Sequence, residues 1–275
     1  MKKILILSIT SLLLFSCNDK NDSPENKAVS KAIAVYNQAY QENFEADKID
    51  DILLNATNAY VLIDPFVNNN HTSIAAIQAK GNEVGAYISI GTGETYRNDF
   101  TELQPFLVAK PWDEWPDEYF INSTTTGVIE IMKARIDQIA IWGCDWVEFD
   151  NMDWSFYEES RNKYSFEVTK AQGIAYYQEL CAYVQQKGMK CMAKNTVENA
   201  VNFDGVLYES YNDDKNWWNA SGAQSFLDAG KLVIVNHYNE TNCGQVYSEY
   251  KGIYTTSLSF ICEDANLKKY VHFNE

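Results

Sequence analysis

The sequence of 275 residues predicts an α/β protein folded as a (β/α)8 TIM barrel. Short apolar runs typical of buried strands alternate with amphipathic helical segments, the order expected of a parallel sheet with right-handed crossovers. No glycine-rich dinucleotide fingerprint follows any of these runs, which disfavours a doubly wound sheet. Seven runs are recognisable, and they are Ala59–Asp64, Val84–Ile90, Trp146–Asp150, Lys190–Lys194, Gly205–Glu209, Leu232–His237 and Gly252–Ser257.

The first strand of the expected eight is unclear or degenerate. It should precede Ala59, within residues 43–56, where no convincing apolar run is found. In front of it a helix is predicted over Glu25–Tyr40, because the apolar residues of this segment repeat with helical spacing. These residues are Val29, Ala32, Ile33, Tyr36 and Tyr40.

Three further helices are predicted between the later runs. Val128–Trp142 carries an apolar stripe, and Phe166–Lys187 is followed by Gly188, which suits the left-handed position after a helix. Ala223–Ala229 is shorter and stops at Gly230. The strands and helices together predict a single barrel domain over residues 27–275.

The first residues are typical of a lipoprotein signal peptide over residues 1–16. Two lysines precede a short apolar segment, which is too short to span a bilayer comfortably, and Ser16 stands directly before Cys17. Leu14–Cys17 resembles the bacterial lipobox, so Cys17 would be the lipidated first residue; an ordinary signal peptide cut nearby is the alternative. Residues 17–26 are then a polar tether, and we expect a lipid-anchored protein of the bacterial cell envelope, at the outer membrane or cell surface.

The charge of the chain disfavours one class of partner. The formal net charge is −16, and removal of residues 1–16 takes away Lys2 and Lys3 and makes it −18. A nucleic-acid partner would require a basic face, so none is expected. No cofactor is implied, and the oligomeric state stays open.

Five cysteines remain besides Cys17, in a compartment that permits disulfides. Because the number is odd, at least one stays free unless it pairs between chains. Cys243 with Cys262 and Cys181 with Cys191 are the candidate pairs. Burial without bonding is the alternative for Cys144 and Cys191.

Polar residues end six of the seven runs. In a parallel barrel, strand ends and the loops after them form one face, so these residues predict a polar cup there. They are Asp64, Ser89, Asp150, Lys194 with Asn195, Glu209, and His237 with Tyr238.

Within the cup, Asp150 and Glu209 are the candidate catalytic pair. They end strands two apart in sequence order, and strand alternation turns both toward one side. Hydrolysis of a glycosidic bond requires two carboxyl groups flanking it. Lys194 lies on the strand between them, where it could hold Asp150 ionised or pair with Glu148, which we expect to be buried. Asp150 with Asp153 could instead bind a metal ion, but no third loop ligand is evident.

The order and spacing of several blocks resemble glycoside hydrolase family 114, the endo-α-1,4-polygalactosaminidase-like TIM barrels. The blocks are Gly85–Gly91, Glu94–Arg97, Ile131–Asp137, Gly143–Asp153, Ala193–Asn195 and Tyr208–Glu209. The resemblance implies that Asp150 and Glu209 are the catalytic carboxylates. It also implies that the sugar site is lined by Asp64, Glu94, Arg97, Asn151, Asp153, Lys194, Asn195 and Tyr238.

The chain departs from the family at four places, one of which is Ser210, which follows Glu209 where the family tends to have other polar residues. His237-Tyr238 stands where the family often has Glu-Tyr, Trp146 replaces a usual glycine, and the family's first-strand motif is not evident. The function we expect is a secreted, lipid-anchored hydrolase of an α-linked, amino-sugar-containing polysaccharide. The alternative is a surface glycan-binding lipoprotein that has lost turnover. Retention or inversion depends on the separation of the carboxyl groups.

Overall fold

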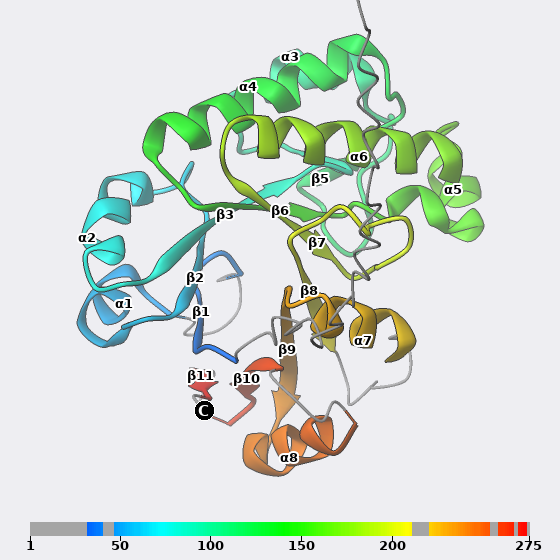
Figure 1. Cartoon of the computed structure of the whole chain (residues 1–275). Coiled ribbons are helices and arrows are strands. Elements are labelled where there is room, and N and C mark those ends of the chain that lie inside the picture. Colours follow the sequence, from blue (N-terminus) through cyan, green and yellow to red (C-terminus); the bar gives the residue numbers. More distant parts are fainter. Residues whose placement is uncertain (1–31, 41–46, 211–219, 254–257, 267–268, 274–275) are drawn as a thin grey trace, which may run out of the picture.

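The computed structural model describes residues 32–40, 47–210, 220–253, 258–266 and 269–273. The signal peptide, Cys17 and the tether lie outside them. Eight parallel strands follow one another around the sheet, and a ninth is antiparallel to the last of them (Figure 1). The parallel strands are β1 (Val35–Asn37), β2 (Tyr60–Ile63), β3 (Glu83–Ser89), β6 (Trp146–Asp150), β7 (Lys190–Lys194), β8 (Gly205–Ser210), β9 (Leu232–Glu240) and β10 (Ser259–Asp264). The predicted (β/α)8 fold class is confirmed.

Helices cover the outside of the sheet and connect its strands (Figure 1). The α-helices are α1 (Ile49–Asn55), α2 (Ile74–Gln78), α3 (Phe100–Leu103), α4 (Thr126–Trp142), α5 (Glu158–Tyr164), α6 (Lys170–Gln186), α7 (Ala220–Asp228) and α8 (Cys243–Ile253). Three short 3-10 helices are η1 (Asn70–Ser73), η2 (Gln104–Phe106) and η3 (Trp154–Phe156). Among the described residues, no helix is both long and apolar enough to cross a membrane.

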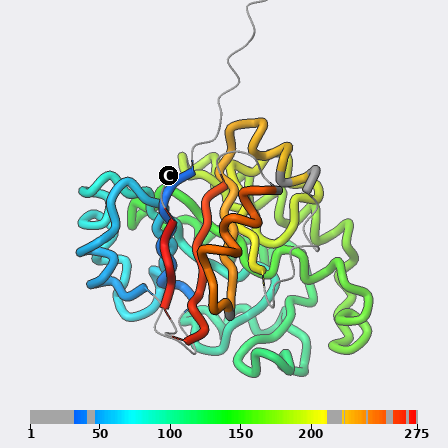
Figure 2. Tube along the Cα trace, turned by 90° about the horizontal axis from the view of Figure 1, so that it is seen from below, coloured from blue at the N-terminus to red at the C-terminus, as the bar shows by residue number. Residues whose placement is uncertain are grey.

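The barrel closes through the ninth strand, β11 (Lys269–His272), which lies beside β1 (Figure 2). Nδ1 of His272 is 2.6 Å from the carbonyl oxygen of Val35, and the backbone N–H of Ile33 donates to Oγ of Ser259 at 3.0 Å. Residues from both ends of the described chain therefore form one seam.

Alternation along the strands produces two apolar clusters. The cluster inside the barrel contains Tyr60, Leu62, Trp146 and Leu207, whereas the larger one fills the space between sheet and helices. Because the interior is packed with side chains, the chemistry is confined to the C-terminal ends of the strands.

The predicted helix over Glu25–Tyr40 is wrong in its described part. Residues 32–40 contain no helix, and the first barrel strand, β1, lies there instead. Val35 faces the barrel interior and Ala34 the outer layer, so the run is apolar on both faces. A continuous apolar run of this kind fits a helix and a fully buried strand equally well by periodicity.

The first strand expected within residues 43–56 is also wrong. Helix α1 occupies Ile49–Asn55, and residues 43–46 lie outside the described part of the chain. At the other end, Gly252 and Ile253 of the predicted run Gly252–Ser257 end α8, and 254–257 are not described. The eighth parallel strand is β10, so residue composition placed it several residues too early.

The remaining predicted strands and helices are confirmed within a few residues of each end. Helix α6 begins later than predicted because Thr169 caps it, with Gln172 completing the capping box. Gly188 has a φ of +83°, as expected at the end of this helix. Cys243 and Cys262 form the predicted disulfide between α8 and β10. Cys181 and Cys191 are buried and not bonded to each other.

Candidate active site

Strand alternation turns a set of polar side chains toward the axis of the barrel at its C-terminal end. On β6, Trp146 packs in the interior cluster, Glu148 stands above it, and Asp150 ends the strand. Glu209 ends the inward row of β8, two strands on, as the sequence predicted. β7 lies between them and carries Lys194.

Lys194 joins the two candidate catalytic acids. Its Nζ lies 3.0 Å from Oδ1 of Asp150 and 3.3 Å from Oε2 of Glu209. Its side chain is 2% exposed. Burial opposes the charge on this ammonium group, but the attraction of the surrounding carboxylates outweighs burial and raises the pKa of Lys194. Lys194 is therefore a permanent cation between two acids.

Glu148 lies one layer below Asp150 and is fully buried. It is 3.6 Å from Nζ of Lys194 and accepts a hydrogen bond from the hydroxyl of Tyr40. Burial raises the pKa of Glu148 to about 7, although Lys194 and the Tyr40 hydroxyl oppose the rise. The ring of Tyr40 also lies under the ammonium group, 3.9 Å from Nζ of Lys194. The expected buried pairing of Glu148 is present, and Tyr40 is a further member of the site.

Asp150 is held by donors on both of its oxygens. The hydroxyl of Tyr87 donates to Oδ2 at 2.8 Å, and the backbone N–H of Asn151 donates to Oδ1 at 2.9 Å. Asn151 adopts a φ of +54°, a left-handed conformation that asparagine tolerates better than most residues. A Cβ at Gly91 would lie 2.0 Å from the backbone oxygen of Asn151, so only glycine permits this packing.

Glu209 is fixed by neighbours from two strands. Nδ2 of Asn195 donates to its Oε2 at 3.0 Å, and the hydroxyl of Tyr238 on β9 donates to Oε1 at 2.9 Å. The side chain of Asn236 supports Tyr238 in turn, at 2.9 Å. The carboxyl group therefore has a defined orientation, with 12% of the side chain exposed.

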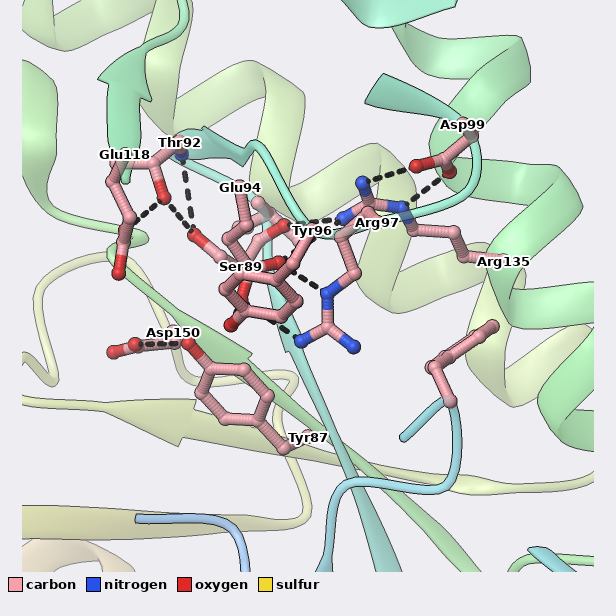
Figure 3. A network of polar contacts seen from close by, with 12 residues as sticks. Tyr87, Ser89, Thr92, Glu94, Tyr96, Arg97, Asp99, Glu118, Arg135 and Asp150 are labelled. Carbon is pink, nitrogen blue, oxygen red and sulfur yellow. Dashed lines mark hydrogen bonds and ion pairs between the residues drawn. The ribbon is translucent and has the colours of Figure 1, made fainter. Parts of the chain in front are cut away.

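Three predicted site residues form a buried ion-pair network beside Tyr87, and Figure 3 shows two of them, Glu94 and Arg97. Arg97 binds Glu94 through Nε at 2.7 Å and Asp64 through Nη1 at 2.9 Å. Burial raises the pKa of Asp64, although Arg97 opposes the rise. Glu94 has no exposed surface, so the network supports the wall of the site. Sugar contact by these three residues stays a prediction.

Asp153 follows β6 and accepts a hydrogen bond from the exposed Tyr157 at 2.8 Å. Burial raises the pKa of Asp153 to about 6, with a smaller contribution from the charges of Asp150 and Glu209. Contact of Asp153 with a sugar stays a prediction.

His237 lies outside the cup. It faces the outer layer of the barrel, stacked on Phe260 and edge-on to Tyr250, and is fully buried. The histidine that stands where the family often has a glutamate therefore packs between β9 and the outer layer. The neighbouring Tyr238 faces the site.

The sequence reasoning missed Tyr40, Tyr87 and Glu118. Tyr87 could have been found, because it shares the inward face of β3 with Gly85 and Ser89. Tyr40 was hidden within the predicted helix. Glu118 lies on β5 (Glu118–Phe120), which pairs with β4 (Thr92–Glu94) inside the long connection between β3 and β6. Strands of three residues give too little alternation to be recognised.

Comparisons with known proteins bear on the family and the fold. The family described as glycoside-hydrolase family GH114 matches residues 24–274. No curated protein matches the chain. Among solved structures, Ega3 of Aspergillus fumigatus in complex with galactosamine is 21% identical, covering 90% of this chain and 96% of that one, with a TM-score of 0.66. The glycoside hydrolase domain of PelA from Pseudomonas aeruginosa is 13% identical, with coverages of 89% and 97% and a TM-score of 0.62. TtGalA, an α-galactosidase from Thermus thermophilus, is 11% identical, with coverages of 84% and 58% and a TM-score of 0.54.

Proposed function

The chain belongs to glycoside-hydrolase family GH114, and on that basis we propose that it hydrolyses an α-linked, amino-sugar-containing polysaccharide with Asp150 and Glu209 as the catalytic pair. The observation that carries this proposal is the position of Lys194, which contacts both carboxylates at the C-terminal end of the barrel. Two acids held on either side of one cation can flank a glycosidic bond, as its hydrolysis requires.

In the proposed mechanism Asp150 is the nucleophile. Lys194, Tyr87 and the N–H of Asn151 hold its carboxylate in place as it attacks the anomeric carbon. Glu209 donates a proton to the leaving oxygen while the glycosidic bond breaks. It then takes a proton from the water that displaces Asp150 from the glycosyl intermediate, so that both residues return to their starting states.

The separation of the two acids supports retention of anomeric configuration. Because Nζ of Lys194 lies 3.0 Å from Oδ1 of Asp150 and 3.3 Å from Oε2 of Glu209, these oxygens are at most 6.3 Å apart. Retaining enzymes hold the two carboxyl groups roughly 5–5.5 Å apart, whereas inverting enzymes leave roughly 6.5–9.5 Å for a water molecule.

Two observations support an amino-sugar substrate. Ega3, which shares the fold, was solved with galactosamine bound. The described site also holds more carboxyl groups than cations, which suits a polymer that carries amino groups. A lipid anchor on Cys17 would place this activity at the cell envelope, where such polysaccharides are met.

A reducing-end assay on α-1,4-linked galactosamine polymers tests the proposal. We expect wild-type protein to release reducing ends, and Asp150→Asn and Glu209→Gln to abolish release while unfolding at the wild-type temperature. Glu130→Gln, an exposed site on α4, is the matched control and should retain activity. Full activity in either site variant would overturn the catalytic pair. Saccharide binding without any release in the wild type would identify a glycan-binding protein instead.

A further inference from the structure

Glu118 is an acid that the mechanism above does not use. It lies directly opposite Glu94 in the antiparallel pair of β4 and β5. Like charges at directly opposed positions are unfavourable, so such a pair requires a compensating cation. Glu94 receives one from Arg97, but no Lys, Arg or His of the described residues forms an ion pair with Glu118.

The carboxyl group of Glu118 lies beside the catalytic centre. The side-chain amide of Asn151 is 3.4 Å from Oε2 of Glu118 and 3.4 Å from Oδ2 of Asp150, so one amide contacts both acids. In Figure 3 the carboxyl groups of Glu118 and Asp150 turn toward the same side of the network. Glu118 is partly exposed, so a ligand bound at Asp150 can reach it.

The contacts of Glu118 leave room for a donor. The hydroxyl of Thr92 and the amide of Asn151 both reach Oε2, and no side-chain hydrogen bond from the described residues reaches Oε1. Thr92 is itself fixed by Ser89, since their hydroxyls are 2.6 Å apart. The group is therefore pre-oriented on one oxygen and open on the other.

The electrostatic surroundings of Glu118 favour a positively charged ligand. Burial raises the pKa of Glu118 to about 8, the carboxylates of Glu94 and Asp150 add to the rise, and the hydrogen bond from Thr92 and the charge of Lys194 oppose it. Burial and the neighbouring carboxylates therefore favour the protonated form of this carboxyl group. A cation bound at Oε1 would stabilise the ionised form and displace this proton.

We propose that Glu118 binds the ammonium group of the sugar residue that lies against Asp150, and so selects amino sugars without an N-acetyl group. This inference rests on the proposed function and names the group that recognises its substrate. An ammonium group supplies both the charge and the donor that Oε1 lacks. An N-acetyl amide is neutral and bulkier, and it would leave Glu118 protonated.

A role as general acid is the competing explanation, because a protonated carboxyl group near Asp150 could donate to the leaving oxygen. The two roles differ in what they require of the substrate. A general acid is needed whichever group stands on the sugar nitrogen, whereas an ammonium-binding residue is needed only when that nitrogen is charged.

The test compares Glu118→Gln with wild type on two substrates, fully de-N-acetylated and fully N-acetylated α-1,4-galactosamine oligosaccharides. The full chain is purified in detergent, and Glu114→Gln, an exposed acid in the same connection, is the matched control. We expect E118Q to lower kcat/KM on the de-N-acetylated substrate by about tenfold or more, mainly through KM, as for a lost charge-assisted hydrogen bond. On the N-acetylated substrate kcat/KM should not fall, and E114Q should match wild type on both.

Equal losses on both substrates would overturn the inference in favour of a general acid or a structural role, and no loss on either would overturn it outright. If wild-type protein cleaves neither substrate, the proposed function fails, and binding decides the inference separately. Titration with the de-N-acetylated oligosaccharide should then still show weaker binding to E118Q than to wild type. Equal affinities would overturn the inference.

Discussion

Asn195 and Glu209 hold each other through two hydrogen bonds. Nδ2 of Asn195 donates to Oε2 of Glu209 at 3.0 Å, while the backbone N–H of Glu209 donates to Oδ1 of Asn195 at 2.9 Å. Asn195 reaches this position with a φ of +61° directly after β7. The asparagine therefore fixes both the main chain and the carboxyl group of the proposed acid.

Asn195→Ala should lower kcat by about a hundredfold with little change in KM, because the carboxyl group of Glu209 remains present but is no longer held in one orientation. Steady-state kinetics on the galactosamine polymer measure this. Asn199→Ala is the control, since Asn199 also has a left-handed backbone (φ of +51°) but an exposed side chain. If N195A and N199A lower kcat equally, backbone strain rather than orientation of Glu209 is the cause.

The buried carboxyl group of Glu148 should make stability depend on pH. Its pKa is raised from 4.5 to about 7, so the folded state holds this proton more tightly than the unfolded state. The stabilisation of the folded state by this protonated carboxyl group is complete below the ordinary pKa of 4.5, and it is lost as the pH rises through about 7. The difference in unfolding free energy between wild type and Glu148→Gln should therefore fall by about 3 kcal/mol between pH 4 and pH 8.

Urea unfolding of both proteins at a series of pH values measures this difference. Glu130→Gln removes an exposed carboxyl group and should show no comparable trend. A difference that is flat with pH would mean that the pKa of Glu148 is the same in the folded and unfolded states.

Hydrolysis should proceed with retention. Oδ1 of Asp150 and Oε2 of Glu209 lie at most 6.3 Å apart, which is below the roughly 6.5–9.5 Å typical of the carboxyl groups of inverting enzymes. Proton NMR of the first product formed should show the α-anomer before mutarotation. A β-anomer as first product would require a different nucleophile.

The disulfide between Cys243 and Cys262 should stabilise the fold by about 3 kcal/mol, because it closes a segment with a sequence separation of 19 residues. The double variant Cys243→Ala/Cys262→Ala should therefore unfold at lower urea concentration than wild type. Under reducing conditions the two proteins should unfold alike. A difference that persists after reduction would be due to packing at the two sites.

The sequence predicted the middle of the barrel better than its ends. β6, β7 and β8 have clear alternation or clear polar ends, and both proposed catalytic acids lie on them. The prediction for β1 was wrong because a run that is apolar on both faces has no distinctive period. The eighth parallel strand was predicted too early because Tyr254–Ser257 has the composition of a strand, whereas β10 begins at Ser259.

The site residues were likewise predicted where they end a clear strand and missed elsewhere. Residues on strand ends were predicted, and the structure brings Asp150, Lys194, Asn195, Glu209 and Tyr238 together. Glu118 was not predicted, because its approach to Asp150 depends on how the connection between β3 and β6 folds back over the barrel. Pairing between two three-residue strands across a long connection leaves no local signal in the sequence.

The seam between β1 and β11 bears on the order in which the protein folds. His272 on β11 contacts Val35, 237 positions away, and Ser259 at the start of the adjoining β10 contacts Ile33, 226 positions away. Contacts between such distant residues form late, since most of the chain must be ordered before they can be made. Until then the edge of β1 that faces away from β2 is open to association with other chains, so the docking of β11 protects this strand from aggregation.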